Sequence, residues 1–387
     1  AGERRVKELV KNSNDGYISG EDAFKLYDTY GFPYELTLEY LNELGYSCSK
    51  EEFDKYMNIQ KELARKNSKN KTSMASQKKV LLDFTDKSQF VYGIYRLKTS
   101  VLAIFSKDEI INAVDHDCYI ALDRTCFYAE SGGQVADTGM LLGKNFKARV
   151  LDVFKGPNGQ HIHKVKLLDG VIKIGDNCEA VIDKDRRKKI EANHSSVHIL
   201  QYALQQVVSS NIKQAGSYVD DEKFRFDFTY SGKISDDNIL EVEGFARNVI
   251  SKNLIVSTEI MPLDKAKQLG AMALFSEKYS DIVRVVKIGK SIELCGGTHV
   301  SNTKDIEHFT LYSCESKGSN TYRIEGATGT RSEIALLTAI KPYNDEIIKL
   351  LVKARNILDK ANNEGIKLKF DVDIDNTKPT SYKDIMF

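Results

Sequence analysis

The chain contains 387 residues, enough for two or three domains with well-buried cores, so it needs no disulfide staples to fold. Its 56 Lys and Arg residues against 55 Asp and Glu give a formal net charge of +1, which excludes a global positive field that would attract nucleic acid or membranes. Hydrophobic residues at 41% and charged residues at 29%, with only five prolines, exclude widespread Pro-rich disorder and are ordinary for a soluble globular protein.

Residues 1–79 are predicted to form a helical, polar region. Pro33 interrupts the first helical pattern, because proline disfavours a helical conformation at the residue before it. A second helix is expected from near Thr37 or Ser49. Between residues 55 and 79, eight Lys and Arg residues stand against a single acid. Such a run is more often a solvated helix face than an RNA-facing surface, and both interpretations stay open.

Residues 80–185 change to short β-branched and aromatic runs separated by Gly, Asp and Asn. Several short strands at this spacing predict a small antiparallel β-barrel. The strands are expected at 119–122, 148–154, 161–165 and 179–182. His161 and His163 share one face of the third strand, and we interpret them as structural.

Residues 186–332 are predicted to form an α+β domain with an antiparallel sheet, because helical and strand-like patterns follow one another there. We expect helices at 190–208, 237–252 and 264–270, and strands at 225–228 and 282–286. The remainder, 333–387, is predicted to be a helix to about residue 364 and then a polar tail of unspecified structure. The fold class is therefore α+β.

The cysteines indicate a reducing compartment. Six of them lie far apart without CxxC pairs, and the chain shows no signal-peptide pattern. No run of 18 apolar residues occurs, so no membrane-spanning helix is expected. We therefore expect reduced thiols in a cytoplasmic protein.

Two short motifs predict a metal site. His194 and His198 lie four residues apart on the predicted helix, which places both imidazoles on one face about one turn apart. Cys295 and His299 flank Gly-Gly-Thr after a predicted strand, where the glycines favour a tight turn that brings thiolate and imidazole together. Three His and one Cys are the ligand types that Zn²⁺ prefers.

Chance alone explains this combination poorly. A chain of this composition contains roughly 0.13 HxxxH and 0.11 CxxxH pairs by accident. The alternatives are two helix histidines, one buried and one solvated, and a Cys295 that is simply a small buried hydrophobe. Four protein ligands would close the site and make it structural, whereas displacement of one ligand would admit water, and the sequence does not decide between these.

A glycine pair supplies a third candidate. Gly132 and Gly133 precede Gln134 and could let a ligand approach the backbone, while the Gln134 amide could contact a carbonyl or hydroxyl group. A hairpin turn or bulge is the more common use of such a pair.

These motifs resemble the editing half of the alanyl-tRNA synthetase family. Asn193 to His198 is similar to the family's Asn-His-Thr-Ala-Thr-His, and Cys295 to His299 matches its Cys-Gly-Gly-Thr-His. Further resemblance lies in segments 23–33, 127–134, 216–228 and 270–279. The departures are Ser195, Ser196 and Val197 in the first motif and Ser276 at a position where the family usually has glycine.

The resemblance implies a fragment without the class II aminoacylation core and without the C-terminal glycine-rich domain. Its function would be hydrolysis of tRNA(Ala) mischarged with serine or glycine, as part of a synthetase whose other domains are its partners. In this interpretation, 1–79 is a linker region, 80–185 the barrel, 186–332 the metal-binding editing domain, and 333–387 the C-terminal helix and tail.

The resemblance also implies roles for individual residues. Zn²⁺ would be held by His194, His198, Cys295 and His299. Gln134 and Thr298, with Cys295, would form the catalytic group, Gln134 contacting the aminoacyl moiety and Thr298 either recognising the serine hydroxyl or bracing the turn. Substrate and tRNA would be bound by Gly132, Gly133, Lys184, Arg186, Arg187, Lys188 and Lys189, the last five through acceptor-stem phosphates.

Two other functions compete with this hypothesis. One is a non-catalytic tRNA-binding module with a structural zinc. The other is a free-standing trans-editing deacylase, which the resemblance of the first 80 residues to a joined synthetase disfavours.

Overall fold

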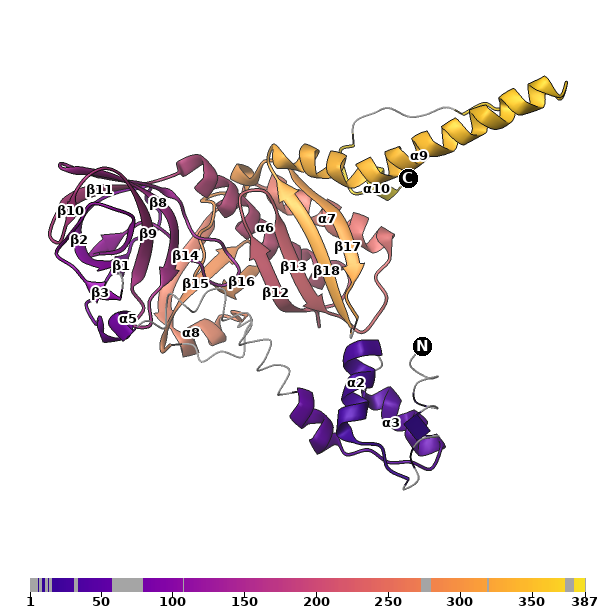
Figure 1. Cartoon of the computed structure of the whole chain (residues 1–387), viewed down its shortest axis with the longest axis horizontal. Coiled ribbons are helices and arrows are strands. Elements are labelled where there is room, and N and C mark those ends of the chain that lie inside the picture. Colours follow the sequence, from indigo (N-terminus) through magenta and orange to yellow (C-terminus); the bar gives the residue numbers. More distant parts are fainter. Residues whose placement is uncertain are drawn as a thin grey trace. The chain divides into compact units, whose positions relative to one another are not determined.

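The computed structural model divides into two compact units, which are treated separately here: residues 1–85 with 317–319, and residues 86–316 with 320–387 (Figure 1). The residues that the structure describes are 6, 9–10, 13, 16–30, 34–57, 79–106, 108–272, 280–318, 320–372 and 379–386. The segments 31–33, 58–78 and 273–279 lie outside them, and with them the Pro33 turn, nearly all of the basic run and Ser276.

The first unit is helical, as predicted. Its elements are α2 (Gly20–Tyr30), α3 (Tyr34–Glu43), a helical stretch over 50–57 and α5 (Lys79–Asp83). Ser19 caps α2, since its hydroxyl accepts the amide of Asp22 at 3.1 Å. The helices pack through two small clusters that contain the buried side chains of Leu26 and Phe53.

The second unit begins with the predicted antiparallel barrel. Six strands close into a ring in the order β11, β7, β8, β9, β5, β2, with β2 pairing back onto β11. Their bounds are β2 (Arg96–Ser106), β5 (Cys118–Leu122), β7 (Gly139–Gly143), β8 (Phe146–Lys155), β9 (His161–Gly170) and β11 (Asn177–Ile182). Short strands flank the ring: β1 (Gln89–Phe90), β3 (Glu109–Ile110), β4 (Ala113–Val114), β6 (Arg124–Thr125) and β10 (Ile172–Lys173).

All four strands predicted in this region are confirmed as β5, β8, β9 and β11. The sequence analysis missed β2, although its burial alternates along much of its length. Its polar residues Lys98, Thr99 and Ser100 conceal the period of two that marks a half-buried strand.

His161 and His163 are buried in the barrel, where both bond to backbone carbonyls. His161 Nδ1 lies 2.9 Å from the Phe127 carbonyl, and His163 Nδ1 lies 3.1 Å from that of Ile120. His163 Nε2 is 2.8 Å from Thr125 Oγ1. A ring that donates from Nδ1 and accepts at Nε2 is neutral, so burial lowers the pKa of His163 to about 3.

This buried histidine predicts a loss of stability in acid. His163 is neutral when folded but takes up a proton near pH 6.5 when unfolded, so its contribution is complete above that pH and declines as pH falls toward 3, by about 1.4 kcal/mol per pH unit. Urea unfolding of the metal-free protein between pH 7.5 and 4 should therefore show a shallower pH dependence for His163→Gln than for the wild type. The exposed His116→Gln is the control, and parallel profiles for all three proteins would contradict the assignment.

The second part of this unit is an α+β domain, as predicted. Its larger sheet has the order β12 (Lys213–Val219), β13 (Phe224–Thr229), β18 (Thr321–Thr328), β17 (Phe309–Ser316). Its smaller sheet has the order β14 (Val256–Pro262), β15 (Ile282–Ile288), β16 (Ser291–Leu294). The helices are α6 (Lys184–Val207), α7 (Asp236–Ser251), α8 (Leu263–Gln268) and the 3-10 turn η1 (Thr303–Ile306).

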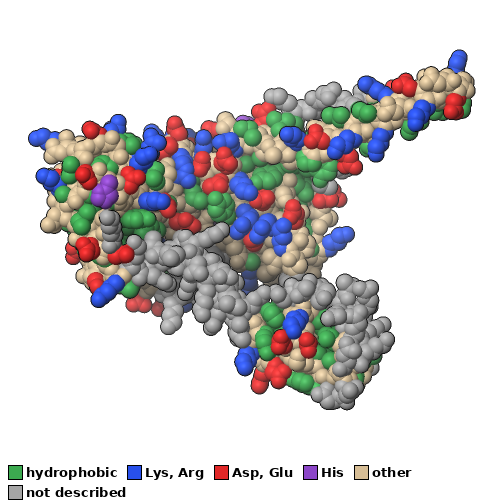
Figure 2. Space-filling model, viewed as in Figure 1, with side chains coloured by type: hydrophobic (Ala, Val, Ile, Leu, Met, Phe, Trp, Pro, Cys, Tyr) green, Lys and Arg blue, Asp and Glu red, His purple; other side chains and the backbone are tan. Residues whose placement is uncertain are grey.

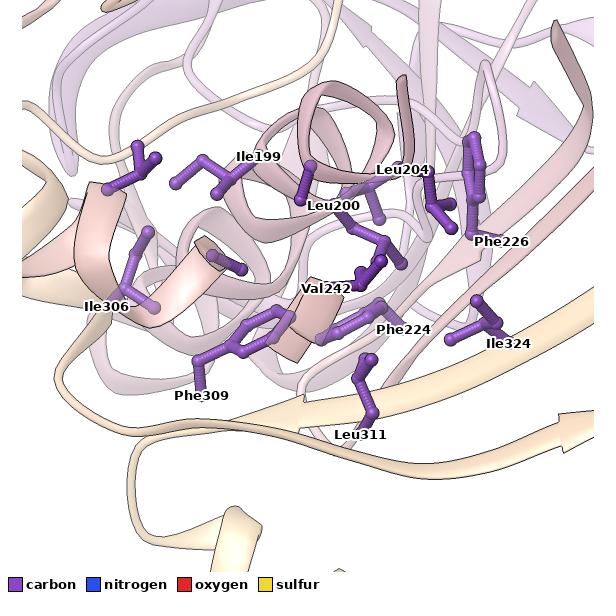
Figure 3. Close-up of a cluster of buried hydrophobic side chains, with 14 of the residues drawn as sticks. Ile199, Leu200, Leu204, Phe224, Phe226, Val242, Ile306, Phe309, Leu311 and Ile324 are labelled. Atoms are coloured by element: carbon purple, nitrogen blue, oxygen red, sulfur yellow. The ribbon is translucent and has the colours of Figure 1, made fainter. Parts of the chain in front are cut away.

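The core of this domain lies between the larger sheet and helices α6 and α7. On β13, Phe224, Phe226 and Phe228 alternate with polar residues and are fully buried, which is the pattern of a strand with one covered face. Leu200 of α6 and Val242 of α7 meet them from the other side (Figure 3). Each fully buried side chain of this kind contributes roughly 1.5–3 kcal/mol, so α6 is held firmly against the sheet.

The C-terminal helix is confirmed as α9 (Arg331–Asn363), whose residues 341–350 are all exposed. The tail differs from the expectation, because residues 379–386 pack onto the domain and form α10 (Lys383–Met386). Tyr382 is 4% exposed, and its amide lies 3.2 Å from the buried Glu243 carboxylate. A single aromatic residue in a polar segment gave no periodic pattern from which this packing could be predicted.

None of the helices in the described ranges combines the length and apolar character needed to cross a bilayer. All six cysteines lie within those ranges and are unpaired.

Candidate metal centre

Helix α6 carries the first two candidate ligands. Asp183 caps it by accepting the Arg186 amide at 3.1 Å, so the helix begins at Lys184, six residues before the predicted start. His194 and His198 are buried one turn apart, with ring centroids separated by 5.5 Å. The spacing therefore places both imidazoles on one face, as predicted.

The loop after β16 carries the other two. The hairpin of β15 and β16 ends with the Cys295 amide donating to the Arg284 carbonyl at 3.1 Å, and the chain then turns through Gly296 and Gly297 to His299. A Cβ on Gly297 would overlap the His194 ring and come within 2.9 Å of Gln134 Oε1. Gly297 is therefore required for the loop to approach α6, whereas a Cβ on Gly296 would meet nothing within 4 Å.

The two motifs converge on one point. One ligand atom from each of His194, His198, Cys295 and His299 can be chosen so that all four lie within 4.8 Å of one another. Cys295 Sγ is 3.5 Å from His194 Nε2 and 3.4 Å from His299 Nε2. Three imidazoles and a thiol gathered in this way form a donor set that suits a borderline-soft ion such as Zn²⁺, so the residues fit a metal.

A polar group stands behind each imidazole, at the nitrogen remote from the cluster centre. His194 Nδ1 is 2.7 Å from Gln134 Oε1, and His299 Nδ1 is 3.1 Å from Ser195 Oγ. His198 Nδ1 is 3.0 Å from Glu293 Oε2, in an ion-pair contact without hydrogen-bond alignment. Such partners fix ring orientation and leave the opposite nitrogen, Nε2, for the metal.

The charges within the cluster favour a thiolate. Burial opposes ionisation of Cys295, but the three neighbouring imidazoles outweigh it and hold the pKa of the thiol well below its usual value. Burial, followed by repulsion from His194, lowers the pKa of His299 to about 3. Burial also opposes protonation of His198, yet Glu293 and then Cys295 raise its pKa to about 10. A thiolate beside a neutral His299 is the protonation state that metal binding requires of these two groups.

The cluster has one accessible side. His194 and His198 are buried, whereas Cys295 and His299 are half-buried and Gly296 is exposed. A substrate would therefore reach the cluster over the Cys-Gly-Gly loop.

Gly132 and Gly133 form a hairpin turn, the more common of the two uses considered. Ser131 and Gln134 exchange both backbone hydrogen bonds around them, and both glycines have positive φ, of 60° and 84°. Ser217 of β12 packs so closely against Gly133 that no Cβ would fit there. The turn delivers Gln134 into the cluster, where its Nε2 donates to Thr298 Oγ1 and its Oε1 accepts the Thr298 amide, each at 2.9 Å.

The structure divides the five basic residues at the start of α6. Lys184, Lys188 and Lys189 are exposed. Arg186 is half-buried and pairs with Asp221 at 3.0 Å. Arg187 is 1% exposed and donates to Asp137 Oδ1 at 2.8 Å and to the Cys126 carbonyl at 3.0 Å. Arg187 thus anchors α6 to the barrel side and presents no surface to a phosphate.

Sequence reasoning missed the partners of the imidazoles other than Gln134. Glu293 precedes Cys295 by two residues on the same strand side, and Ser195 follows His194 directly. Alternation along β16 could have indicated Glu293, because residues two apart share a face. No local pattern predicts the pairing of Ser195 with His299, which are 104 residues apart.

Two family models match the chain: "tRNA synthetases class II (A)" over residues 1–186, and "Threonyl and Alanyl tRNA synthetase second additional domain" over residues 283–325. The curated relatives include the alanine–tRNA ligase of Geobacillus thermodenitrificans, 44% identical over 328 residues, which are 84% of this chain and 37% of the relative. That of Acholeplasma laidlawii is 39% identical over 387 residues, 98% of this chain and 42% of the relative. The chain thus spans about two fifths of the length of these relatives.

Proposed function

The chain belongs to the alanyl-tRNA synthetase family, and on that premise we propose that it hydrolyses the ester that joins serine or glycine to tRNA(Ala). The observation that carries this proposal is the convergence of His194, His198, Cys295 and His299 on one point with an accessible side. The proposed partners are tRNA(Ala) and the remaining domains of the parent synthetase.

The chemistry of amino-acid selection explains why such a site is needed. A pocket that holds alanine cannot exclude the smaller glycine by size, and one additional hydroxyl on serine is hard to reject by binding alone. Hydrolysis at a second site corrects both errors. That site must accept the mischarged ester and spare alanine.

We propose zinc as the metal, held by the Nε2 atoms of the three histidines and by the Cys295 thiolate. The chemistry that such an ion supplies is Lewis acidity, which polarises an ester carbonyl and makes water a better nucleophile. Ser195, Gln134 and Glu293 orient the three rings from behind. The half-buried side of the cluster leaves room for the aminoacyl end next to Cys295 and Gly296.

Thr298 is the proposed recognition group for serine, and Gln134 is its partner. A threonine hydroxyl that accepts one hydrogen bond can still donate another. Because Gln134 Nε2 donates to Thr298 Oγ1, the hydroxyl hydrogen of Thr298 is directed away from the amide. It could then donate to the seryl hydroxyl, and the Gln134 amide would set its direction.

The exposed lysines at the start of α6 are proposed to contact acceptor-stem phosphates. Replacing Lys184, Lys188 and Lys189 with alanine should weaken tRNA(Ala) binding and reduce the slope of log affinity against log salt by about 2, at roughly 0.7 for each lost contact. The comparison is binding measured between 50 and 200 mM salt. The control carries alanine at Lys341, Lys349 and Lys353, exposed lysines of α9, and an equal change of slope in both variants would rule out a specific role for the α6 lysines.

Hydrolysis of matched Ser-, Gly- and Ala-tRNA(Ala) by the wild-type chain tests the proposed function. We expect release of serine and glycine and protection of alanine. Hydrolysis of all three at one rate would contradict the selectivity, and hydrolysis of none would contradict the activity.

A structural zinc in a non-catalytic tRNA-binding module is the second candidate. It is favoured by the four protein ligands themselves, since structural zinc sites use four and catalytic sites commonly three. Stoichiometric zinc and tRNA binding without hydrolysis would select this alternative.

A further inference from the structure

Two side chains from outside the Cys-Gly-Gly loop bind three of its carbonyls in succession. Arg284 donates from one guanidinium nitrogen to the carbonyls of Cys295 and Gly297, at 2.8 and 2.9 Å. The Tyr92 hydroxyl donates to the carbonyl between them, that of Gly296, at 2.7 Å. The guanidinium carbon lies 4.2 Å from the centre of the Tyr92 ring, so the two donors also stack on each other.

The β15–β16 hairpin explains why Arg284 reaches this loop. Val285 pairs with Leu294, and the ladder extends by one residue so that Arg284 lies opposite Cys295. Tyr92 comes from the segment between β1 and β2, almost two hundred residues earlier in the chain. The loop is therefore held from the small sheet and from the barrel together.

Fixing the carbonyls also fixes the amides, since each peptide unit is planar. With its carbonyls turned toward Arg284 and Tyr92, the loop directs the Gly297 amide at Cys295 Sγ, 3.4 Å away, and the Thr298 amide at Gln134 Oε1. The first contact favours the thiolate, and the second places Gln134 against His194. The backbone of the loop is thus organised on the side that faces the histidines.

We infer that Arg284 and Tyr92 are positioning residues that hold the Cys295–Gly297 backbone in the conformation that presents the Cys295 sulfur to the metal. This carbonyl clamp, defined by Arg284 and Tyr92, rests on the metal centre proposed above. Neither side chain is a ligand. Their effect is to make the ligand loop ready before the ion arrives, which lowers the ordering cost of binding.

Metal affinity measured by chelator competition tests the clamp. Arg284→Lys keeps the charge but loses the forked geometry, and we expect it to weaken zinc binding by about 10–100-fold, the usual cost of losing an outer-shell partner. Tyr92→Phe keeps the ring and loses one hydrogen bond, so we expect a smaller loss, of roughly 3–10-fold. The visible absorption of the cobalt-substituted proteins should show a weakened thiolate band in the same order.

Two variants of matched chemistry serve as controls. Arg247 also donates to two carbonyls, those of Phe309 and Thr380, and Tyr322 also donates to a glycine carbonyl, that of Gly232. Arg247→Lys and Tyr322→Phe should leave zinc affinity and the cobalt spectrum as in the wild type. Thermal unfolding of all metal-free variants separates an effect on the loop from general destabilisation.

The outcomes are distinct for the clamp and for the function. Wild-type affinity and spectrum in both Arg284→Lys and Tyr92→Phe would overturn the clamp while leaving deacylation intact. A wild type that binds zinc but does not hydrolyse Ser-tRNA(Ala) would overturn the proposed function alone, and the affinity comparison would still decide the clamp. A wild type that binds no zinc or cobalt would overturn both.

Discussion

Cys295→Ser is expected to abolish stoichiometric zinc binding and to reduce hydrolysis of Ser-tRNA(Ala) by about 100-fold or more, beyond the 10–100-fold typical of an outer-shell change. The substitution removes the only sulfur in the cluster with little change in volume. It also removes the negative charge that accompanies the three imidazoles, since a serine hydroxyl does not ionise at neutral pH. The measurements are elemental analysis of protein purified without added metal and single-turnover deacylation.

The matched control is Cys314→Ser, a half-buried cysteine of β17 outside the cluster. It should keep full zinc content and activity. Folding of both variants is checked by thermal unfolding. Full activity in Cys295→Ser without bound zinc would remove the metal from the mechanism.

Gly297→Ala is expected to have an effect of similar size without touching a ligand. The added methyl group would overlap the His194 ring and crowd Gln134 Oε1, so either the imidazole or the loop must move. Overpacking of this kind costs about 1–3 kcal/mol of folding free energy. Displacement of His194 from Cys295 should also reduce zinc affinity by roughly 100-fold.

The adjacent glycine provides the control for this variant. Gly296 is exposed, has no positive φ, and offers open space to a Cβ, so Gly296→Ala should leave stability and zinc content nearly unchanged. Urea unfolding and chelator competition on the pair distinguish crowding from loss of backbone freedom. Equal losses in both variants would show that flexibility of the loop, not space beside His194, is what the glycines provide.

The sequence predicts those elements of the fold that carry a regular apolar period. Strand β13 alternates Phe with polar residues, and α6 has a clear helical stripe, so both were placed within a few residues, apart from the early start of α6. Strand β2 and the packed tail around Tyr382 were missed, because the first mixes its period with polar residues and the second depends on a distant partner, Glu243. Contacts of this kind have no local pattern.

The candidate site shows the same division. Spacing within a helix or a tight loop predicts the pairs His194 with His198 and Cys295 with His299, and the structure brings both pairs together. Burial is not contained in spacing: Arg187 belongs to a basic run, yet it serves as a buried partner of Asp137. The carbonyl clamp could have been approached from the hairpin turn at Gly289, which sets Arg284 opposite Cys295, but Tyr92 could not.

The long sequence separations within the centre have a consequence for how the protein acquires its metal. Gln134 and His194 are 60 residues apart, and His194 and Cys295 are 101 apart, so the contacts close large loops and form only after the barrel turn, α6 and the small sheet have each folded. No early folding intermediate can hold all four ligands with their supporting groups. Metal uptake during refolding would therefore mark the completion of the native topology, and a chain halted before that stage would remain unable to retain the ion.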